Sequence, residues 1–439
     1  MASDYDLVIL GGGREGRIAA MTAVGYGARV ALVEPPGLYD DGQRQKFLLL
    51  GLQQLGQVKR RQAVGEWFGY KKAAGSLTWP ALIAWSQIAA ESESTLSVAR
   101  LSASGVDVVL ERPARLSQQM VVTTEHRRLS ARGAIAAYGR VPFAMPLLAS
   151  STLPEAVNVV GGSILAIAWA EALAAVGVDV RLTPTRVPIL PEADKDMRRL
   201  VRSQLIAAGI EIAPITSSDR FTLNTGFTLS IEPGEPALTL PDFVNKSTKS
   251  SYLSVNHKLQ TAHPRLFACG SAIDQSVNAH SAEYETRLAV KNALFLPQEN
   301  VDYRAVVQGY DRYTCVGMTE AKAMRQYGIV KTQVLTASSA GSTDLSRVSP
   351  LPMYCKLVVV SDRLMGLHLL GEGAEGLACL LSKWVGKPLT DLDDGSLSGQ
   401  GLVKLVAECV VRSRQSRWQI GHWRRDWAEN WFNWRRSRS

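Results

Sequence analysis

Three glycines and one acid near the start of the chain are the residues whose types and spacing could do chemistry. Gly11, Gly13 and Gly16 stand in the pattern G-x-G-x-x-G, and Glu34 follows them at the end of an apolar run. In such a pattern the first glycine makes a tight turn, the second lets the backbone approach a pyrophosphate, and the third lets a helix pack closely on a strand. A carboxylate at Glu34 could accept hydrogen bonds from a ribose. The pattern predicts a dinucleotide site, and the alternative is a glycine-rich turn that binds nothing.

Two strands and a helix must position these residues. The apolar run at residues 7–10 is typical of a buried parallel strand. A helix is expected to follow the glycines and to end near Gly27, and a second apolar strand covers residues 30–33. The N-terminus of that helix would offer free N–H groups to phosphate. Strand, turn, helix, strand and acid together support the dinucleotide interpretation, which the glycine pattern alone would not carry.

The same arrangement returns in residues 157–183, with an apolar strand, a glycine turn, a helix and a second strand. Two such units form an internal repeat of dinucleotide folds. The second copy lacks the binding residues: Ser163 and Ala166 replace glycines, and Pro184 stands where the first copy has its acid. Proline offers no hydrogen bond to a ribose. Arg186 could meet a 2′-phosphate or be a solvated surface residue, and the second site is predicted to be weak or empty.

Composition and charge place the chain among ordinary globular proteins. Of its 439 residues 46% are hydrophobic and 20% are charged, and no apolar run is long enough to predict a transmembrane helix. The formal charge of +9 lies mostly in the last residues, where eight arginines from Arg412 onward face two acids, so nucleic-acid binding by the body is not expected. Five scattered cysteines without metal-type spacing fit a reducing cytosol, and a cytoplasmic location is expected.

The C-terminal tail, residues 412–439, is rich in tryptophan and arginine. Trp423, Trp427, Trp431 and Trp434 fall within one face of a helix. Such a face with arginine flanks is typical of helices that lie in the membrane interface. Three interpretations stay open, namely contact with a membrane surface, docking on the protein's own body or its dimer mate, and contact with another protein.

Several further pieces of sequence occur in a recognisable order. They are AYGRVP at residues 137–142, LFACG at 266–270, VGMTEA at 316–321 and MGLHLLGEG at 365–373. With the two glycine units, these pieces make the chain resemble the two-dinucleotide-binding-domain flavoproteins of the pyridine nucleotide–disulfide oxidoreductase family over roughly residues 4–395.

The resemblance implies an α/β fold with two Rossmann-like dinucleotide-binding domains, one for FAD and a degenerate one for NAD(P), a C-terminal α+β dimerisation domain and the Trp/Arg-rich helical tail. The implied domains are residues 1–151 and 251–300 for FAD, 152–250 for the degenerate NAD(P) domain, 301–411 for dimerisation and 412–439 for the tail. A homodimer is implied as well. The implied FAD contacts are Gly11, Gly12, Gly13, Arg14, Glu15, Gly16, Glu34, Lys46, Gly139, Gly270 and Ser271. Lys46 would point near the flavin, and a surface lysine is the alternative.

The departures from the family pattern remove its usual chemistry. No cysteine precedes Cys269, so the family's C-x-x-x-x-C disulfide cannot exist here. Residues 396–408 hold no histidine or proline where the family has His-Pro…Glu, and Ser271 stands where it has an acid. Without neighbouring thiols there is no dithiol relay, and without the histidine there is no general base for a thiol substrate. Thiol–disulfide and mercuric reduction are therefore disfavoured, and binding of NAD(P)H is doubtful.

Two functions from different classes remain. The first is a FAD-dependent oxidoreductase whose flavin passes electrons directly to a small acceptor such as a quinone or oxygen. The second is a catalytically inactive relative that keeps FAD as a structural or sensing element and works through its tail on a membrane or protein partner. No metal site is expected in either case.

Overall fold

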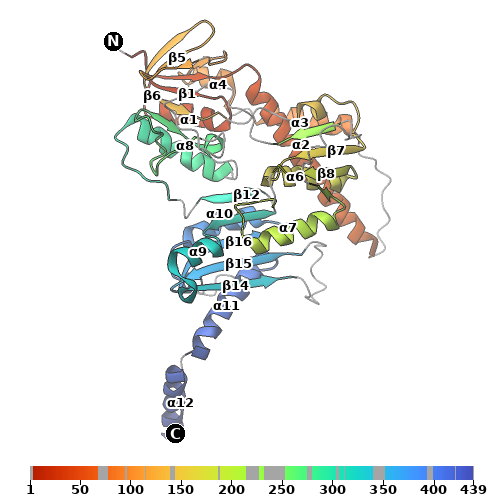
Figure 1. Ribbon diagram of the computed structural model, residues 1–439, viewed down its shortest axis with the longest axis vertical. Coiled ribbons are helices and arrows are strands. Elements are labelled where there is room, and N and C mark those ends of the chain that lie inside the picture. Colours follow the sequence, from red (N-terminus) through yellow and green to blue (C-terminus); the bar gives the residue numbers. More distant parts are fainter. Residues whose placement is uncertain are drawn as a thin grey trace. The chain divides into compact units, whose positions relative to one another are not determined.

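The computed structural model describes residues 3–67, 78–93, 96–113, 115–138, 144–185, 188–213, 227–231, 253–273, 279–302, 306–310, 312–339, 352–392, 399–420 and 422–438. The chain divides into two compact units, whose elements are labelled in Figure 1. The first unit comprises Met1–Glu192 and Arg198–Asp302, and the second comprises Ala193–Met197 and Tyr303–Ser439. The predicted division into domains that end at residues 151, 250, 300 and 411 is finer than these units and stays a prediction.

A mostly parallel sheet forms the centre of the first unit. Among the described residues its central strands lie in the order β3–β2–β1–β6, and β11 also pairs with β6. The side chains of β1 and β2 that face the core are almost completely buried, as is typical of parallel strands in α/β proteins. The parallel strands are β1 (Tyr5–Leu10), β2 (Val30–Val33), β3 (Asp107–Val109), β6 (Arg128–Ala136) and β11 (Leu266–Ala268). The short strands β4 (Arg115–Leu116) and β5 (Val121–Thr123) continue the sheet in antiparallel fashion beyond β6.

Helices connect these strands, and some of them pack against the sheet. The helix α1 packs against α8, and the long helix α2 packs against α3. The helices are α1 (Arg14–Gly25), α2 (Leu38–Trp67), α3 (Trp79–Ser92), α4 (Val98–Ala103), α5 (Met145–Leu148) and α8 (Ala279–Leu294), with a short 3₁₀ helix η3 (Gly270–Ala272) between β11 and α8. The predicted strand–turn–helix–strand unit around Gly11 is therefore confirmed.

The predicted repeat forms a second parallel sheet in the same unit. Its described strands lie in the order β10–β7–β8–β9 and are all parallel. They are β7 (Ala156–Val160), β8 (Asp179–Thr183), β9 (Glu211–Ile212) and β10 (Phe227–Ser230), with helices α6 (Ile164–Val176) and α7 (Lys195–Ala207). Gly177 ends α6 with a left-handed backbone, φ +100°, which favours glycine at a helix C-terminus. Two parallel sheets in a mixed α/β chain are consistent with two Rossmann-like folds.

An antiparallel sheet organises the second unit. Its described strands lie in the order β12–β13–β16–β15–β14, and a core of aliphatic side chains lies between this sheet and helices that include α10 and α11. The strands are β12 (Val307–Tyr310), β13 (Tyr313–Gly317), β14 (Thr332–Ser338), β15 (Tyr354–Val360) and β16 (Arg363–Leu370). The helices are α9 (Glu320–Tyr327), α10 (Ala374–Leu381), α11 (Leu402–Ile420) and α12 (His422–Arg436), with 3₁₀ turns η4 (Ile329–Lys331), η5 (Ser382–Trp384) and η6 (Leu389–Leu392). A role of this sheet in dimerisation stays a prediction.

A buried lysine ties segments of the second unit together. Lys356 Nζ on β15 donates to Asp194 Oδ1 at 2.7 Å, to Asp196 Oδ2 at 2.7 Å and to Glu320 Oε2 at 2.6 Å. The lysine side chain is 0% exposed and that of Asp194 is 3% exposed. Although burial lowers the pKa of Lys356, the three carboxylates raise it above its usual value. The ammonium group thus takes the place that a cation would have among these three acids.

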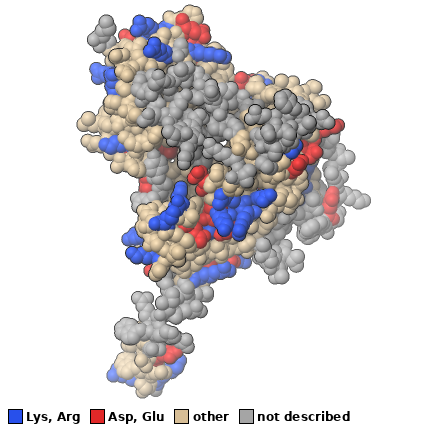
Figure 2. All heavy atoms as spheres, viewed as in Figure 1, with Lys and Arg blue, Asp and Glu red and all other residues tan. Residues whose placement is uncertain are grey.

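The described surface carries charges of both signs, as the composition of a globular protein predicts. On the face shown in Figure 2, acidic and basic side chains are interspersed over the described surface. No helix in the described part of the chain combines the length and the apolarity that a membrane crossing would need.

Candidate functional site

The glycine turn has no room for side chains. Gly11 has φ +113°, and a Cβ there would lie 2.4 Å from the Cα of Tyr138 on the neighbouring segment. A Cβ on Gly16 would lie 1.7 Å from the carbonyl oxygen of Gly11. Both positions therefore require glycine, the first for its backbone conformation and the second for close packing.

The N-terminus of α1 presents its backbone N–H groups without a side-chain cap. Gly13 is the N-cap residue, and no side chain bonds to the first turn from that position. A helix of twelve residues with uncapped N–H groups attracts an anion such as a pyrophosphate. In the second unit of the repeat, by contrast, Ser163 Oγ accepts a hydrogen bond from Ala166 N at 3.3 Å and so caps α6 itself. The N–H groups at the start of α1 are thus open to a phosphate, whereas one N–H group at the start of α6 is already bonded by Ser163.

Glu34 is a buried acid with one unsatisfied oxygen. The residue is 1% exposed and follows β2 directly. Its Oε1 accepts a hydrogen bond from Arg17 Nη2 at 2.5 Å, whereas Oε2 has no hydrogen-bond partner in the described part of the chain. Burial raises the pKa of Glu34 to about 7, and the guanidinium of Arg17 opposes that rise only in part. An orphaned buried oxygen favours a ligand that brings a hydroxyl donor, as a ribose does.

Arg17 is a site residue that the sequence did not single out. Its Nε donates to the carbonyl oxygen of Gly12 at 3.0 Å and its Nη1 to that of Leu96 at 2.7 Å, while its guanidinium carbon lies 3.8 Å from the centroid of the Tyr39 ring. These contacts hold the arginine in place independently of Glu34. Its position directly after the third glycine was the available signal, but the contacts come from segments far apart in the sequence.

Glu15 and Gly270 meet beneath the turn. A Cβ on Gly270, which has φ +59°, would lie 2.8 Å from Glu15 Cγ. The N–H of Gly270 donates to Glu285 Oε2 at 3.2 Å, and burial raises the pKa of Glu15. Burial thus disfavours the charged form of Glu15, which lessens its repulsion of an anion at this turn.

The remaining predicted FAD contacts lie on α1, η3 and α2, apart from Gly139. Arg14 lies in the first turn of α1 and pairs with Glu283 of α8, with Nη2 and Oε2 3.2 Å apart. Ser271 lies in η3 beside Gly270, and Gly139 lies outside the described residues. Lys46 donates to Glu93 Oε2 at 2.8 Å, with 39% of its side chain exposed. The structure thus brings together the glycine turn, Glu34, Glu15 and Gly270, and it pairs Lys46 with an acid at the end of α3.

The cysteines of the chain begin late in the sequence, and none precedes Cys269. The first cysteine of the chain, Cys269, is buried, and burial raises its pKa to about 12. Since a thiolate is the reactive form, Cys269 is poorly suited to thiol chemistry.

Parallel sheets with a glycine-rich strand–turn–helix unit define a protein that binds dinucleotides. Comparison with known proteins then gives the family: the chain belongs to the pyridine nucleotide-disulphide oxidoreductase family, whose model matches residues 5–286. The family predicted from the sequence is confirmed, and membership supports a FAD-binding oxidoreductase. The doubt about NAD(P)H that arose from the sequence finds no support in these comparisons.

Three curated relatives illustrate the similarity. The chain is 24% identical over 387 residues to a dihydrolipoyl dehydrogenase of Bacillus subtilis (strain 168), and the alignment covers 76% of this chain and 82% of the relative. It is 23% identical over 416 residues to a glutathione reductase of Burkholderia cepacia, which covers 84% and 90%. It is 21% identical over 420 residues to a mercuric reductase of Lysinibacillus sphaericus, which covers 84% and 75%.

The residues present fit FAD on the first unit. The orphaned Glu34 Oε2 offers an acceptor to a ribose hydroxyl, and the uncapped α1 offers N–H donors to a pyrophosphate. Gly11 and Gly16 leave the backbone bare where a side chain could not fit. These groups could therefore hold the ribose and the pyrophosphate of FAD.

Proposed function

We propose that this protein is a FAD-dependent oxidoreductase that passes electrons from the flavin directly to a small acceptor, a quinone or oxygen, without dithiol chemistry. The observation that supports it best is Glu34, a buried acid with an unsatisfied oxygen beside an uncapped helix N-terminus. Without a bound nucleotide this site would destabilise the protein, because a buried oxygen that accepts no hydrogen bond lowers the free energy of unfolding.

The chain's own residues would bind and orient the cofactor. Glu34 would accept from the ribose, and the N–H groups at the start of α1 would donate to the pyrophosphate. Arg14, in the first turn of α1, would reduce the negative charge there. When it is bound, FAD supplies two-electron redox chemistry.

The absence of a dithiol separates this proposal from the activities that the names of the relatives describe. No cysteine precedes Cys269, and Cys269 is a buried thiol with a raised pKa. A relay through two neighbouring thiols is therefore not part of the proposal. Electrons would leave the flavin by direct contact with an acceptor.

The family's name favours a nicotinamide nucleotide as the electron donor. We propose that NAD(P)H reaches the second glycine unit weakly, because Ser163 already caps α6 and Pro184 replaces the ribose-binding acid. The N-terminus of α6 keeps further N–H groups for a phosphate, so weak binding rather than exclusion is expected.

A second candidate is a non-catalytic FAD protein that works through its tail. Trp427 and Trp431 stack with ring centroids 6.0 Å apart, and Trp431 and Trp434 with centroids 5.1 Å apart. These three indoles are 62%, 45% and 46% exposed. Exposed indoles beside Arg435 and Arg436 favour a membrane surface or a protein partner. The two candidates share FAD and a homodimer, and they differ in catalysis.

One experiment distinguishes them. NADH or NADPH is added without oxygen to the purified yellow protein, and the flavin absorbance is followed. Rapid bleaching with either nucleotide supports the oxidoreductase. Bleaching by dithionite alone supports the second candidate, and a protein purified gently without flavin contradicts both.

A further inference from the structure

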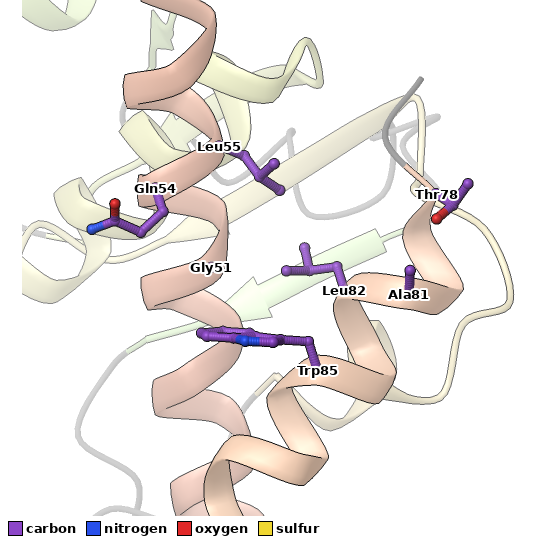
Figure 3. A pocket seen from close by; sticks show the side chains of 7 residues that line it. All are labelled: Gly51, Gln54, Leu55, Thr78, Ala81, Leu82 and Trp85. Carbon is purple, nitrogen blue, oxygen red and sulfur yellow. The ribbon is translucent and has the colours of Figure 1, made fainter. Parts of the chain in front are cut away.

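Helices α2 and α3 enclose an apolar groove in the first unit that is separate from the residues assigned to FAD. Its volume is about 410 Å³, within the range of about 300–1,000 Å³ typical of small-molecule sites. Figure 3 shows its lining, which is Gly51, Gln54, Leu55, Thr78, Ala81, Leu82 and Trp85. None of these described lining residues is charged, so the groove suits a neutral ligand.

Gly51 lets the indole of Trp85 form one wall of this groove. A Cβ at position 51 would lie 2.5 Å from Leu82 Cδ1 and 3.0 Å from Trp85 Cζ3. The indole therefore reaches from α3 across to the backbone of α2, as Figure 3 shows. The side chain is 44% exposed, so one broad aromatic surface stays open to a flat ring.

Aromatic contacts connect the groove with Lys46 and Phe47, which precede Gly51 on α2. Phe47 contacts Trp85 edge to face, with ring centroids 6.1 Å apart, and Lys46 Nζ lies 4.9 Å from the Phe47 centroid. Phe47, Gly51 and Leu55 recur every four residues and so share one face of α2. Lys46 near the flavin is one of the two interpretations that the sequence left open, the other being a surface lysine, and under the first the contacts of Phe47 would connect the flavin with the groove.

Two neutral polar groups stand among the apolar ones. Gln54 and Thr78 are exposed lining residues without charge. In Figure 3 the amide of Gln54 points away from Leu82 and Trp85. Thr78, at the start of α3, can donate a hydrogen bond to a carbonyl oxygen. A flat apolar ring that carries carbonyl groups matches this lining better than a charged or a purely aliphatic ligand.

We propose that this groove binds the ring of a quinone, the electron acceptor of the proposed function. The proposal rests on that function for its redox role. The quinone would take two electrons from the bound flavin and two protons, and it would leave as the quinol. Trp85 would provide the surface on which the ring stacks.

The test is a calorimetric titration of the oxidised, full-length holoprotein with 2-methyl-1,4-naphthoquinone. Trp85→Ala removes the stacking surface, and Ala81→Leu fills the groove from an exposed position on α3. Each should weaken binding at least about tenfold, or about 1.4 kcal/mol. The matched control is Ala84→Leu, an exposed alanine on the same helix that does not line the groove, and Trp85→Phe should restore most of the affinity.

Several results would overturn the assignment. They are no binding of the naphthoquinone, binding that survives both Trp85→Ala and Ala81→Leu, or a loss with Ala84→Leu equal to that with Ala81→Leu. A change of oligomeric state on Trp85→Ala would also overturn it, because the groove would then be a contact between copies of the chain.

The rate at which the quinone reoxidises the reduced flavin tests the groove assignment and the proposed function separately. If the quinone reoxidises the reduced flavin equally fast in Trp85→Ala, the function stands and the groove assignment is wrong. If the quinone binds at Trp85 but never reoxidises the flavin, the groove assignment stands as a binding site and the quinone-reducing function is wrong. Slower reoxidation by quinone with unchanged reoxidation by ferricyanide supports both.

Discussion

Replacing Glu34 by glutamine should weaken FAD binding and, at the same time, stabilise the protein that lacks FAD. The substitution keeps the shape of the side chain and removes the charge that a ribose hydroxyl would meet at Oε2. A hydrogen bond to a charged group contributes about 1.5–3 kcal/mol. The dissociation constant for FAD should therefore rise about 10- to 150-fold.

The stabilising effect follows from the raised pKa. Burial raises the pKa of Glu34 to about 7, well above the usual value of about 4.5 for a glutamate, so ionising it costs the folded apoprotein about 3 kcal/mol more than it costs the unfolded chain. Below about pH 4.5 both states keep the proton and no cost arises, and above about pH 7 the cost is complete. The side chain of Arg17 should keep its position in the variant, because Gly12, Leu96 and Tyr39 still contact it.

Urea unfolding of the apoprotein at pH 5 and pH 8 measures this effect, and flavin fluorescence measures FAD binding. The free energy of unfolding of the wild type should fall by up to about 3 kcal/mol between these pH values, relative to Glu34→Gln. Lys291→Gln is the control, because its pair with Glu299 is exposed and contributes little to the free energy of unfolding. A Glu34→Gln protein that binds FAD as tightly as the wild type, or an apoprotein that it destabilises at pH 8, would refute the reasoning.

Three further predictions concern the lysine cluster, the second glycine unit and the tail. Lys356→Met should lower the free energy of unfolding by about 3–5 kcal/mol, since it leaves the buried Asp194 without its ion-pair partner, and a loss in urea unfolding of less than about 1 kcal/mol, the value of an exposed pair, would contradict this. Ser163→Gly should tighten NADH binding in a titration with little loss of stability, because it frees an N–H of α6 at a cost of a few tenths of a kcal/mol. Unchanged or weaker binding would argue against the second glycine unit, residues 157–183, as the nicotinamide site. Deleting residues 415–439 should release the protein from vesicles that contain anionic lipid and leave its flavin content unchanged, with replacement of Trp427, Trp431 and Trp434 by alanine as the matched variant; unaltered vesicle binding would argue against a membrane role of the tail.

The glycine turn and the strands around it could be predicted from sequence because their requirements are local. Gly11 needs a left-handed backbone and Gly16 needs close packing, and both needs are met within one strand–turn–helix unit. The apolar runs at residues 7–10 and 30–33 became β1 and β2 for the same reason. The repeat that begins at residue 157 followed from the same local rules.

The electrostatics and the groove could not be predicted, because they depend on contacts between distant segments. The pairing of Lys46 with Glu93 joins α2 to the end of α3, and Arg17 reaches the carbonyl group of Leu96. The orphaned oxygen of Glu34 depends on which of its two oxygens Arg17 engages. Such choices are made by tertiary packing and leave no periodic signal in the sequence.

A reductive titration of the holoprotein with dithionite tests the central claim most directly. Without a dithiol partner, the flavin should bleach completely after about two electrons per FAD, and every increment should change its absorbance from the start. An initial uptake of about two electrons per FAD that leaves the oxidised flavin spectrum largely intact, with bleaching complete only near four, would reveal a redox-active disulfide and contradict the account.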